Sequence, residues 1–573
     1  MLRGIGTSKG IGIGKALVLP KENIVISNKT IEDVDGEIQR FQDATDCFIK
    51  ETEKLIENLI NKLNGNDRNA AVLKNQLYLV KDVELIKGIE SSIRDKKLNG
   101  EAAVDETCNG LISMFAGMDS EAMRQRVADI EDMKNRLIRI MQGITDIDLT
   151  RLPDNTIIIA EEIHPSVTAS MDTEHVVGII SERGGETSHA SILARALEIP
   201  AVLSVKDICS LVNNGDEIIV DGAYGEVFVS PIERTIRIYE KKKAQYEESV
   251  RELKEFINKQ TESADGHRYM LAANIGNAEE AAKAVANGAE GVGLFRTEFL
   301  FMNGNSMPTE QQQFEEYKKA AVLLKGKPLT IRTLDIGGDK DIPYMGLTKE
   351  TNPFLGYRAI RFCLDRVDIF TTQLKAILRA SAYGNIRILI PMVTSLSEIL
   401  AVKRLVKGIC KSLDKDDIKY DKDIKIGVMI ETPAAAVMAD VLAGEADFFS
   451  IGTNDLTQYM LAVDRGNENV AYLYSVFNPA VLRVIKNIID CAHEKSIEVG
   501  MCGEAAGNEY MIPLLIAMGL DEFSVTYSKV PETRKNIASW TIKESLSILD
   551  TVLGFSEEKE VSNYLNDYIM GRH

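Results

Sequence analysis

The stretches GVMIETPAA (427–435) and FFSIGTNDLTQY (448–459) show the pattern that decides the fold of the C-terminal half of this chain. Each begins with a short apolar run, passes to a polar residue and continues into a helical segment. Six further runs of this kind lie at 268–274, 291–295, 330–335, 386–391, 498–502 and 522–526. Eight strands, each followed by a helical segment, predict a (β/α)8 TIM barrel between residues 262 and 573.

Polar residues follow several of these predicted strands, where the active site of such a barrel lies. They are Arg296 after the second strand, Arg332 and Asp335 on the third, Glu431 after the fifth, Asn454 and Asp455 after the sixth, and Cys502 at the end of the seventh. Arg358 in NPFLGYRAIR (352–361) and Arg465 in AVDRGN (462–467) add two cations. Several arginines at one rim suit a small ligand with two anionic groups, because guanidinium groups match phosphate and carboxylate. Each arginine alone also fits a surface salt bridge.

Glu431 and Asp455 form the candidate metal site. They end adjacent predicted strands, and Mg²⁺ usually takes one or two carboxylates together with substrate oxygens and water. The alternative is that each carboxylate only neutralises an arginine of the rim. Cys502, in GMCGEAAG (500–507), is a candidate acid, because a thiol with a pKa near ~8.5 is mostly protonated at neutral pH. Its alternative role is that of a small buried hydrophobe.

A second, smaller α/β domain is predicted upstream. Its candidate strands are TIIIAEEI (156–163), VVGIIS (176–181), DEIIVDG (216–222) and EVFVS (226–230). Within it, GGETSHASILARALEIP (184–200) places His189 after a Gly-Gly turn, at the predicted start of a helix. Helix N-termini favour anions, and imidazole is a competent nucleophile near neutral pH, so His189 is a candidate phosphate carrier. The alternative is an exposed histidine in a helix-capping segment.

The remaining segments complete a multidomain α/β chain with an all-α insertion. Residues 22–144 have helical spacing of apolar residues and predict four or so helices, inserted between residues 1–21 and 145–230 of the small domain. Residues 231–261 predict one long helical linker, in which Lys243 interrupts an apolar seam. The glycines of residues 1–20 fit neither phosphate-loop template and favour a glycine-rich strand with tight turns.

The composition of the chain argues against several classes of function and location. The chain has 573 residues, of which 67 are Lys or Arg and 86 are Asp or Glu, so its net charge of −19 argues against nonspecific binding to nucleic acid or anionic membranes. Its seven cysteines are scattered without a CxxC motif, which favours reduced thiols in the cytoplasm and no structural zinc. No signal peptide or membrane span is expected from the apolar runs.

Taken together, seven motifs resemble the enzyme I family of the bacterial phosphoenolpyruvate-dependent sugar phosphotransferase system. They are GGETSHASILAR, GLFRTEFLFM, IRTLDIGGDK, NPFLGYRAIR, GVMIETP, FFSIGTNDLTQY and CGEAAG. The resemblance covers nearly the whole chain. It implies a cytoplasmic, Mg²⁺-dependent enzyme, dimeric through its barrel, that moves phosphate from phosphoenolpyruvate to His189 and then to a histidine of the carrier protein HPr, releasing pyruvate as the first step of sugar uptake.

The resemblance also assigns roles to single residues. It implies that phosphoenolpyruvate is held by six of them: Arg296, Arg332, Arg358, Asn454, Asp455 and Arg465. Glu431 and Asp455 bind Mg²⁺, Cys502 protonates the enolate, and the insertion 22–144 docks HPr. Tyr78, Asp82, Glu84 and Arg126 are expected contacts of HPr, although they carry no local signature. Glu186 departs from the family pattern, which often has arginine there, and we expect its charge to destabilise a phosphate on His189.

Three other classes fit less well. Pyruvate phosphate dikinase and phosphoenolpyruvate synthase share the barrel and phosphohistidine motifs, but they need a further nucleotide-binding domain, and no phosphate loop precedes His189 here. The nitrogen-related paralogue of enzyme I usually carries an N-terminal sensory domain. A non-enzymatic regulator would be expected to lose at least one of the catalytic-type residues, which are all present.

Overall fold

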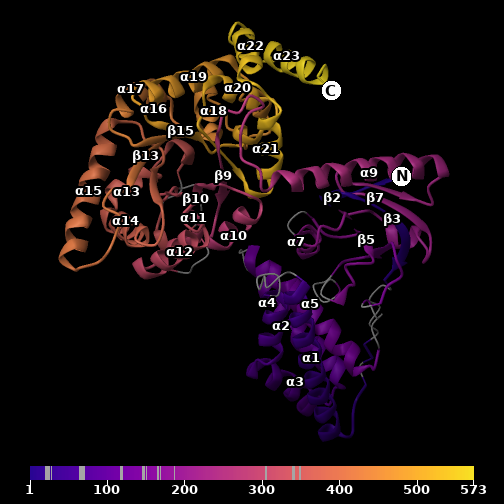
Figure 1. Cartoon of the computed structure of the whole chain (residues 1–573). Helices are drawn as coiled ribbons and strands as arrows, with labels where there is room; N and C mark the ends of the chain where they lie inside the picture. The colour runs from indigo at the N-terminus through magenta and orange to yellow at the C-terminus, as the bar shows by residue number, and fades with distance from the viewer. Residues whose placement is uncertain are drawn as a thin grey trace. The chain divides into compact units, whose positions relative to one another are not determined.

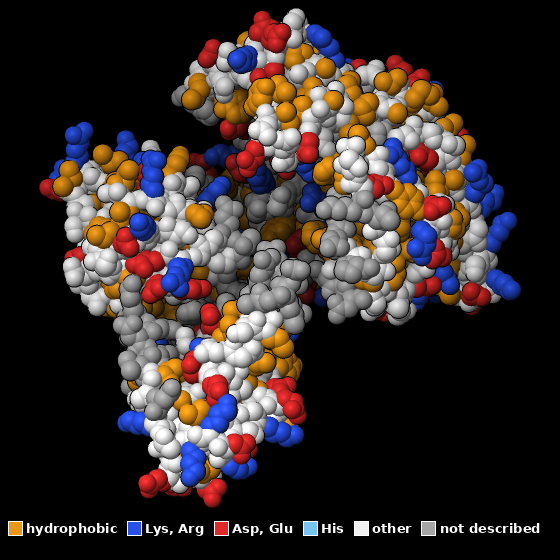
Figure 2. All heavy atoms as spheres, turned by 180° about the vertical axis from the view of Figure 1, so that it is seen from behind, with side chains coloured by type: hydrophobic (Ala, Val, Ile, Leu, Met, Phe, Trp, Pro, Cys, Tyr) orange, Lys and Arg blue, Asp and Glu red, His pale blue; other side chains and the backbone are white. Residues whose placement is uncertain are grey.

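The computed structural model divides the chain into two compact units, Met1–Ser249 and Val250–His573. It describes residues 1–19, 26–27, 29–62, 71–116, 121–144, 149, 151–163, 167, 170–185, 188–302, 306–337, 342–347 and 350–572. Among the helices of these residues, none is both long and apolar enough to cross a membrane. Acidic and basic side chains are interspersed over the face that Figure 2 draws.

The second unit contains a closed barrel of eight parallel strands, so the predicted fold class is confirmed. The strands, in the order in which they neighbour one another, are β9 (Met270–Ile275), β10 (Gly291–Arg296), β11 (Leu329–Arg332), β12 (Ile386–Ile390), β13 (Lys425–Ile430), β14 (Phe448–Ile451), β15 (Glu498–Met501) and β16 (Glu522–Thr526), which pairs back with β9. Each overlaps the apolar run predicted for it. Parallel strands need crossover connections, and helices supply them here.

Helices surround the barrel strands (Figure 1). The larger ones are α10 (Ala278–Ala286), α12 (Glu310–Leu323), α14 (Val367–Ser381), α15 (Leu396–Lys415), α18 (Thr453–Leu461), α19 (Pro479–Glu494), α20 (Met511–Met518), α21 (Val530–Ala538), α22 (Ile542–Leu553) and α23 (Glu558–Met570). Shorter ones are α11 (Glu298–Met302), α13 (Ile360–Asp365), α16 (Pro433–Val437) and α17 (Ala439–Leu442). Inside the barrel, one apolar cluster joins Leu294, Leu389, Met429, Phe448 and Cys502. Cys502 therefore lies at the boundary between the apolar interior of the barrel and its rim.

The first unit contains an eight-stranded mixed sheet in the order β1-β8-β7-β3-β4-β5-β6-β2. The strands are β1 (Leu2–Arg3), β2 (Ile5–Ser8), β3 (Ile11–Val18), β4 (Thr156–Ala160), β5 (Val176–Ser181), β6 (Ala201–Leu203), β7 (Glu217–Asp221) and β8 (Glu226–Val229). The N-terminal strands thus pair with strands that follow residue 155. A Cβ on Gly12 or Gly14 would overlap the carbonyl oxygen of Val177 or Asn155, which explains the glycines of β3 without a nucleotide.

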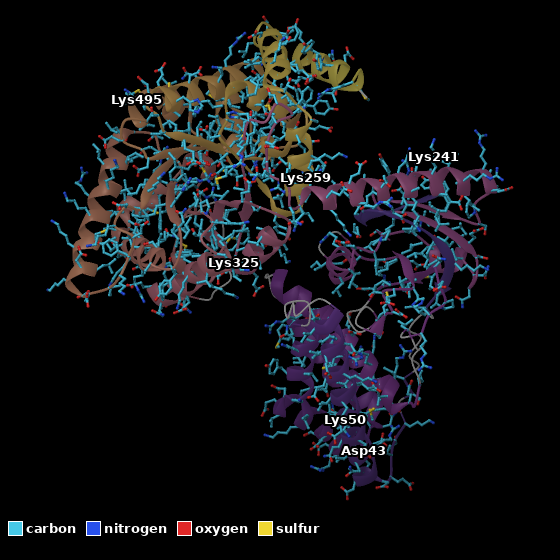
Figure 3. All side chains as sticks on the ribbon, viewed as in Figure 1. Asp43, Lys50, Lys241, Lys259, Lys325 and Lys495 are labelled. Atoms are coloured by element: carbon cyan, nitrogen blue, oxygen red, sulfur yellow. The ribbon has the colours of Figure 1, made fainter. Side chains whose placement is uncertain are left out.

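Five helices lie between β3 and β4 among the described residues, where the sequence predicted four or so. They are α1 (Val34–Lys62), α2 (Ala71–Val80), α3 (Val83–Lys96), α4 (Gly100–Ala116) and α5 (Glu121–Met141). Ile38, Phe41 and Phe48 form part of the buried face of α1, while Asp43 and Lys50 project from it (Figure 3). The predicted boundaries at 21–22 and 144–145 lie at or beside residues outside the described set and stay predictions.

Helix α9 (Glu233–Phe256) contributes residues to both units and is shorter than the predicted 231–261. In the first unit, the hydroxyl of Tyr239 donates to Glu226 Oε2 at 2.9 Å. In the second, the fully buried guanidinium of Arg534 donates to the carbonyl of Phe256 at 2.8 Å and so caps the helix end. Lys241 projects from the exposed side of α9 (Figure 3).

Candidate active site at the barrel rim

The polar residues predicted for the rim lie at the C-terminal ends of the barrel strands. Arg296 and Arg332 are the last residues of β10 and β11, and Glu431 and Cys502 directly follow β13 and β15. Asn454 and Asp455 lie in the first turn of α18, which begins two residues after β14. Because the strands are parallel, these ends meet at one mouth of the barrel.

Two buried arginines are tied to three carboxylates at this mouth. Arg332 contacts Glu298 Oε1 through Nη2, and its Nη1 lies 3.2 Å from Asp335 Oδ2. Arg358 donates to Asp335 Oδ1 through Nε at 3.1 Å and through Nη2 at 2.8 Å. The Nη2 of Arg358 also lies 3.7 Å from Asp455 Oδ2. Charges of alternating sign therefore run from Glu298 to Asp455.

These ion pairs keep the guanidinium groups charged despite burial. The side chains of Arg332 and Arg358 are only 12% and 6% exposed. Burial alone would lower the pKa of Arg332, but the charges of Glu298 and Asp335 raise it above its ordinary value. Within the described residues, Arg332 Nε and Glu298 Oε2 are buried without a hydrogen-bond partner. The orphaned Nε leaves one donor for an anionic ligand.

Glu431 and Asp455 offer the carboxylates for a cation. Glu431 is 2% exposed, and its Oε1 accepts from the amide of Met392 at 2.6 Å. Burial, and then the negative charge of Asp455, raise the pKa of Glu431 well above its ordinary value. A Cβ on Gly452 would lie 2.7 Å from Glu431 Oε2, so glycine leaves the room that this carboxylate needs. A divalent cation would relieve the repulsion between the carboxylates, and their oxygens are the donors that Mg²⁺ prefers.

Glu431 and Asp455 are the two carboxylates of this candidate cation site. Among the described residues, no group of three or more His, Cys, Asp or Glu side chains has the arrangement of a metal site. Mg²⁺ usually keeps several waters and binds through one or two carboxylates plus substrate oxygens, so two carboxylates suit it. The donor set fits a cation that shares its coordination with a substrate.

Cys502 has a protonated thiol in a mostly apolar setting. Its side chain is buried, and Sγ lies 3.8 Å from the carbonyl oxygen of Ile451. Burial raises the pKa of Cys502 to about 11, against smaller opposing effects of Ser450, Arg332 and Arg296. The thiol is therefore a proton donor rather than a nucleophile at neutral pH.

Arg296 and Arg465 complete the set of cations predicted for the rim. Both side chains are exposed, and neither forms an ion pair with a carboxylate in the described parts of the chain. Arg296 lies close enough to influence the Cys502 thiol. Two exposed guanidinium groups therefore add to the two buried ones as possible donors to an anionic ligand.

His189 lies in the first unit and begins α7 (His189–Ala196). Ser188 is its N-cap, and the hydroxyl of Ser188 accepts from the amide of Ser191 at 3.3 Å. The helix start was predicted, and the backbone confirms it. The side chain of His189 and the residues Glu186, Thr187, Asp339 and Lys340 lie outside the described set.

Four rim residues were not singled out by the sequence analysis. Glu298 pairs with Arg332, and Tyr459 donates to the carbonyl of Phe354 at 2.5 Å beside Arg358. Tyr474 and Glu504 both contact Asn454. Glu298, Tyr459 and Glu504 lie within quoted motifs and Tyr474 lies outside them, but the contacts of all four depend on a partner that is distant in sequence.

Comparisons with known proteins agree with this architecture. Three family models match: "PEP-utilising enzyme, N-terminal" over residues 3–126, "PEP-utilising enzyme, mobile domain" over 152–225 and "PEP-utilising enzyme, PEP-binding domain" over 250–542. The chain is 43% identical to a protein of Bacillus sp. (strain S) and 44% identical to one of Geobacillus stearothermophilus, each over 98% of this chain and 97% of the relative. It is 42% identical to one of Bacillus subtilis (strain 168) over 99% of both chains. All three relatives are named "Phosphoenolpyruvate-protein phosphotransferase".

Proposed function

Because this chain belongs to the PEP-utilising enzymes, and among them to the phosphoenolpyruvate-protein phosphotransferases, we propose that it phosphorylates His189 from phosphoenolpyruvate and passes the phosphate to a histidine of HPr. Pyruvate is released, and the transfer is the first step of sugar uptake by the phosphotransferase system. The observation that carries the proposal is the rim itself. It combines two buried arginines held by carboxylates, two exposed arginines, two carboxylates suited to a cation and a thiol that stays protonated at neutral pH.

Phosphoenolpyruvate binds through the cations of the rim. Arg332 and Arg358 are held in place by Asp335, so they are oriented before the ligand arrives. Arg296, Arg465 and the amide of Asn454 supply further donors to the phosphate and carboxylate. Donors fixed in advance stabilise the charge that develops on the phosphoryl oxygens and on the enolate, without reorganising during the reaction.

Mg²⁺ is the cofactor that the carboxylates of Glu431 and Asp455 would hold. When bound, it neutralises charge on the transferring phosphoryl group and orients it. Arg358 Nη2 also lies 3.7 Å from Asp455 Oδ2, so the proposed ligands for the phosphate and for the cation are neighbours in space. Glu431 is fixed by the amide of Met392, which leaves its other oxygen toward Gly452.

The chemical step exchanges one phosphorus bond for another. An imidazole nitrogen of His189 forms a bond to phosphorus as the bond from phosphorus to the enol oxygen breaks, which leaves the enolate of pyruvate. Cys502 donates its proton to the methylene carbon of this enolate and gives pyruvate. A thiol with a pKa of about 11 stays protonated until the strongly basic enolate is formed.

The helices α1–α5 are proposed to dock HPr next to His189. Leu193 of α7 packs in one apolar cluster with Ile56 and Leu59 of α1 and Leu73 of α2, so the helix that begins with His189 contacts this region. Tyr78 at the end of α2 is 75% exposed, and Glu84 at the start of α3 is exposed as well. An exposed aromatic ring and an exposed carboxylate in this region suit a partner surface that is apolar with basic residues. Asp82 is less available, because its carboxylate caps α3.

We also propose that the enzyme works in the cytoplasm as a homodimer that forms through the barrel unit. Val437, Met438 and Val441, on and between α16 and α17 of this unit, expose apolar side chains and support such an interface. Four thiols that are not fully buried, those of Cys47, Cys209, Cys410 and Cys491, fit a reducing compartment.

Pyruvate formation tests the proposed function. The protein is mixed with phosphoenolpyruvate, and pyruvate is followed by a coupled lactate dehydrogenase assay with and without HPr, Mg²⁺ and nucleotide. We expect sustained turnover only when both HPr and Mg²⁺ are present, and no need for nucleotide. The variant His189→Ala should give no turnover. Turnover that requires a nucleotide, or that continues in His189→Ala, would overturn the proposal.

A further inference from the structure

We propose that Glu504 is a positioning residue that holds the amide of Asn454 for the phosphate of the substrate. The inference rests on the proposed function and goes beyond the ligand set predicted from the sequence. Glu504 begins the short 3₁₀ turn Glu504–Gly507 after β15, whereas Asn454 lies in the first turn of α18 after β14. Their contact joins two neighbouring loops of the rim.

The two residues form a reciprocal pair of hydrogen bonds. Asn454 Nδ2 donates to Glu504 Oε1 at 3.2 Å, and the backbone amide of Glu504 donates to Asn454 Oδ1 at 3.0 Å. The backbone amide selects the orientation of the carboxamide, because the opposite orientation would set two N–H groups against each other. The carboxylate binds one of the two N–H groups of Nδ2 and leaves the other for the site.

Contacts of the surrounding loops hold Asn454 and Glu504 in place. A Cβ on Gly503 would overlap Thr453 Oγ1, so glycine allows the loop after β15 to lie against the start of α18. On the other side, Asn274 Nδ2 donates to the carbonyl of Cys502 at 3.0 Å. The hydroxyl of Tyr474 donates to the backbone carbonyl of Asn454 at 3.1 Å, so Asn454 is held at its main chain and its side chain.

The charge of Glu504 distinguishes positioning from a direct electrostatic role. A carboxylate at the rim repels the phosphate and carboxylate of the substrate, so its removal alone should strengthen binding. The hydrogen bond to Asn454 has the opposite effect, because it holds the amide where the phosphate is bound. Glu504→Ala removes both, whereas Glu504→Gln removes the charge and keeps an oxygen that accepts from Asn454 Nδ2.

Steady-state kinetics separate the two roles. We expect Glu504→Ala to raise the KM for phosphoenolpyruvate by about ten-fold, which corresponds to about 1.4 kcal/mol, and to lower kcat less than three-fold. Glu504→Gln should have a KM equal to that of the wild type or lower. Glu509→Ala, an exposed glutamate of the same loop, is the matched control and should change neither constant. A lower KM in Glu504→Ala as well as in Glu504→Gln would overturn the proposal.

A double-mutant cycle shows whether Glu504 acts through Asn454. If it does, Glu504→Ala should change KM by less than two-fold in an Asn454→Ala background. An undiminished ten-fold effect in that background would contradict the proposal, and so would a fall in the melting temperature of Glu504→Ala that the ligand does not reverse. A wild-type protein without turnover would refute the proposed function instead, so the two failures are distinguishable.

Discussion

Glu522 gives a stability prediction whose size follows from its surroundings. It is the first residue of β16, is 6% exposed, and extends over Gly293, where a Cβ would overlap its Oε1. Burial, and then the charge of Glu498, raise the pKa of Glu522 to about 7 from an ordinary 4.5, against the opposing charge of Arg387. Its ionisation therefore opposes folding at neutral and alkaline pH.

The sign and size follow from linkage. A carboxyl whose pKa is higher in the folded state contributes stability below pH 4.5, and that stability is lost as the pH rises through about 7. The difference between the two pKa values corresponds to about 3 kcal/mol. The uncharged variant Glu522→Gln should thus be more stable than the wild type by about 3 kcal/mol at pH 8 and by about 1 kcal/mol or less at pH 5.

Differential scanning calorimetry measures this difference. With the usual unfolding entropy per residue, the unit 250–573 gains roughly 4–5 °C in Tm at pH 8. Glu509→Gln, an exposed glutamate of the same unit, is the control and should leave Tm unchanged at both pH values. An equal gain for Glu522→Gln at pH 5 and pH 8, or no gain at pH 8, would refute the reasoning.

Three further predictions concern the rim. Asp335→Ala removes the carboxylate that pairs with two buried arginines, and it should lower the free energy of unfolding of the barrel in urea by about 3–5 kcal/mol. Asp368→Ala is the control, because it breaks an exposed ion pair with Arg366 and should hardly change the urea midpoint of unfolding. Gly452→Ala places a Cβ against Glu431 and should raise the Mg²⁺ concentration for half-maximal turnover about ten-fold. Gly408→Ala is the control, because its Cβ meets open space, and it should leave this Mg²⁺ concentration unchanged. Alkylation of Cys502 by iodoacetamide should accelerate about ten-fold per pH unit up to about pH 10, because the thiolate is the reactive form; a plateau near pH 8 would contradict a pKa of about 11.

The barrel could be predicted because each strand is a short apolar run that ends at a polar residue. The predicted run 425–430 matches β13, and 522–526 matches β16. The three-residue strand β6 (Ala201–Leu203) was missed, because so short a run lacks a period. The boundary between α2 and α3 also has little signal in the sequence. Only Lys81 and Asp82 separate these helices, and neither residue is a glycine or proline.

The residues of the candidate site could be predicted from the sequence, but the residues with which they pair could not. Arg332 and Glu431 follow strands, so the fold places them at one mouth. The sequence could not show that Asp335 lies between two arginines, because Arg358 follows it by 23 residues in a loop. Glu504 and Asn454 are separated by 50 residues, and their contact depends on how two loops pack. Which residues pair with one another thus depends on tertiary packing, and the local sequence pattern does not show it.

Site mapping after labelling with phosphoenolpyruvate tests the central claim most directly. The protein is incubated with phosphoenolpyruvate labelled in the phosphoryl group, Mg²⁺ and no nucleotide, and the labelled peptide is identified under alkaline conditions that preserve phosphohistidine. The account predicts one acid-labile phosphate on His189, which leaves the protein when HPr is added and appears on a histidine of HPr. Label on another residue, label on His189 that never moves to HPr, or no label without ATP would contradict it.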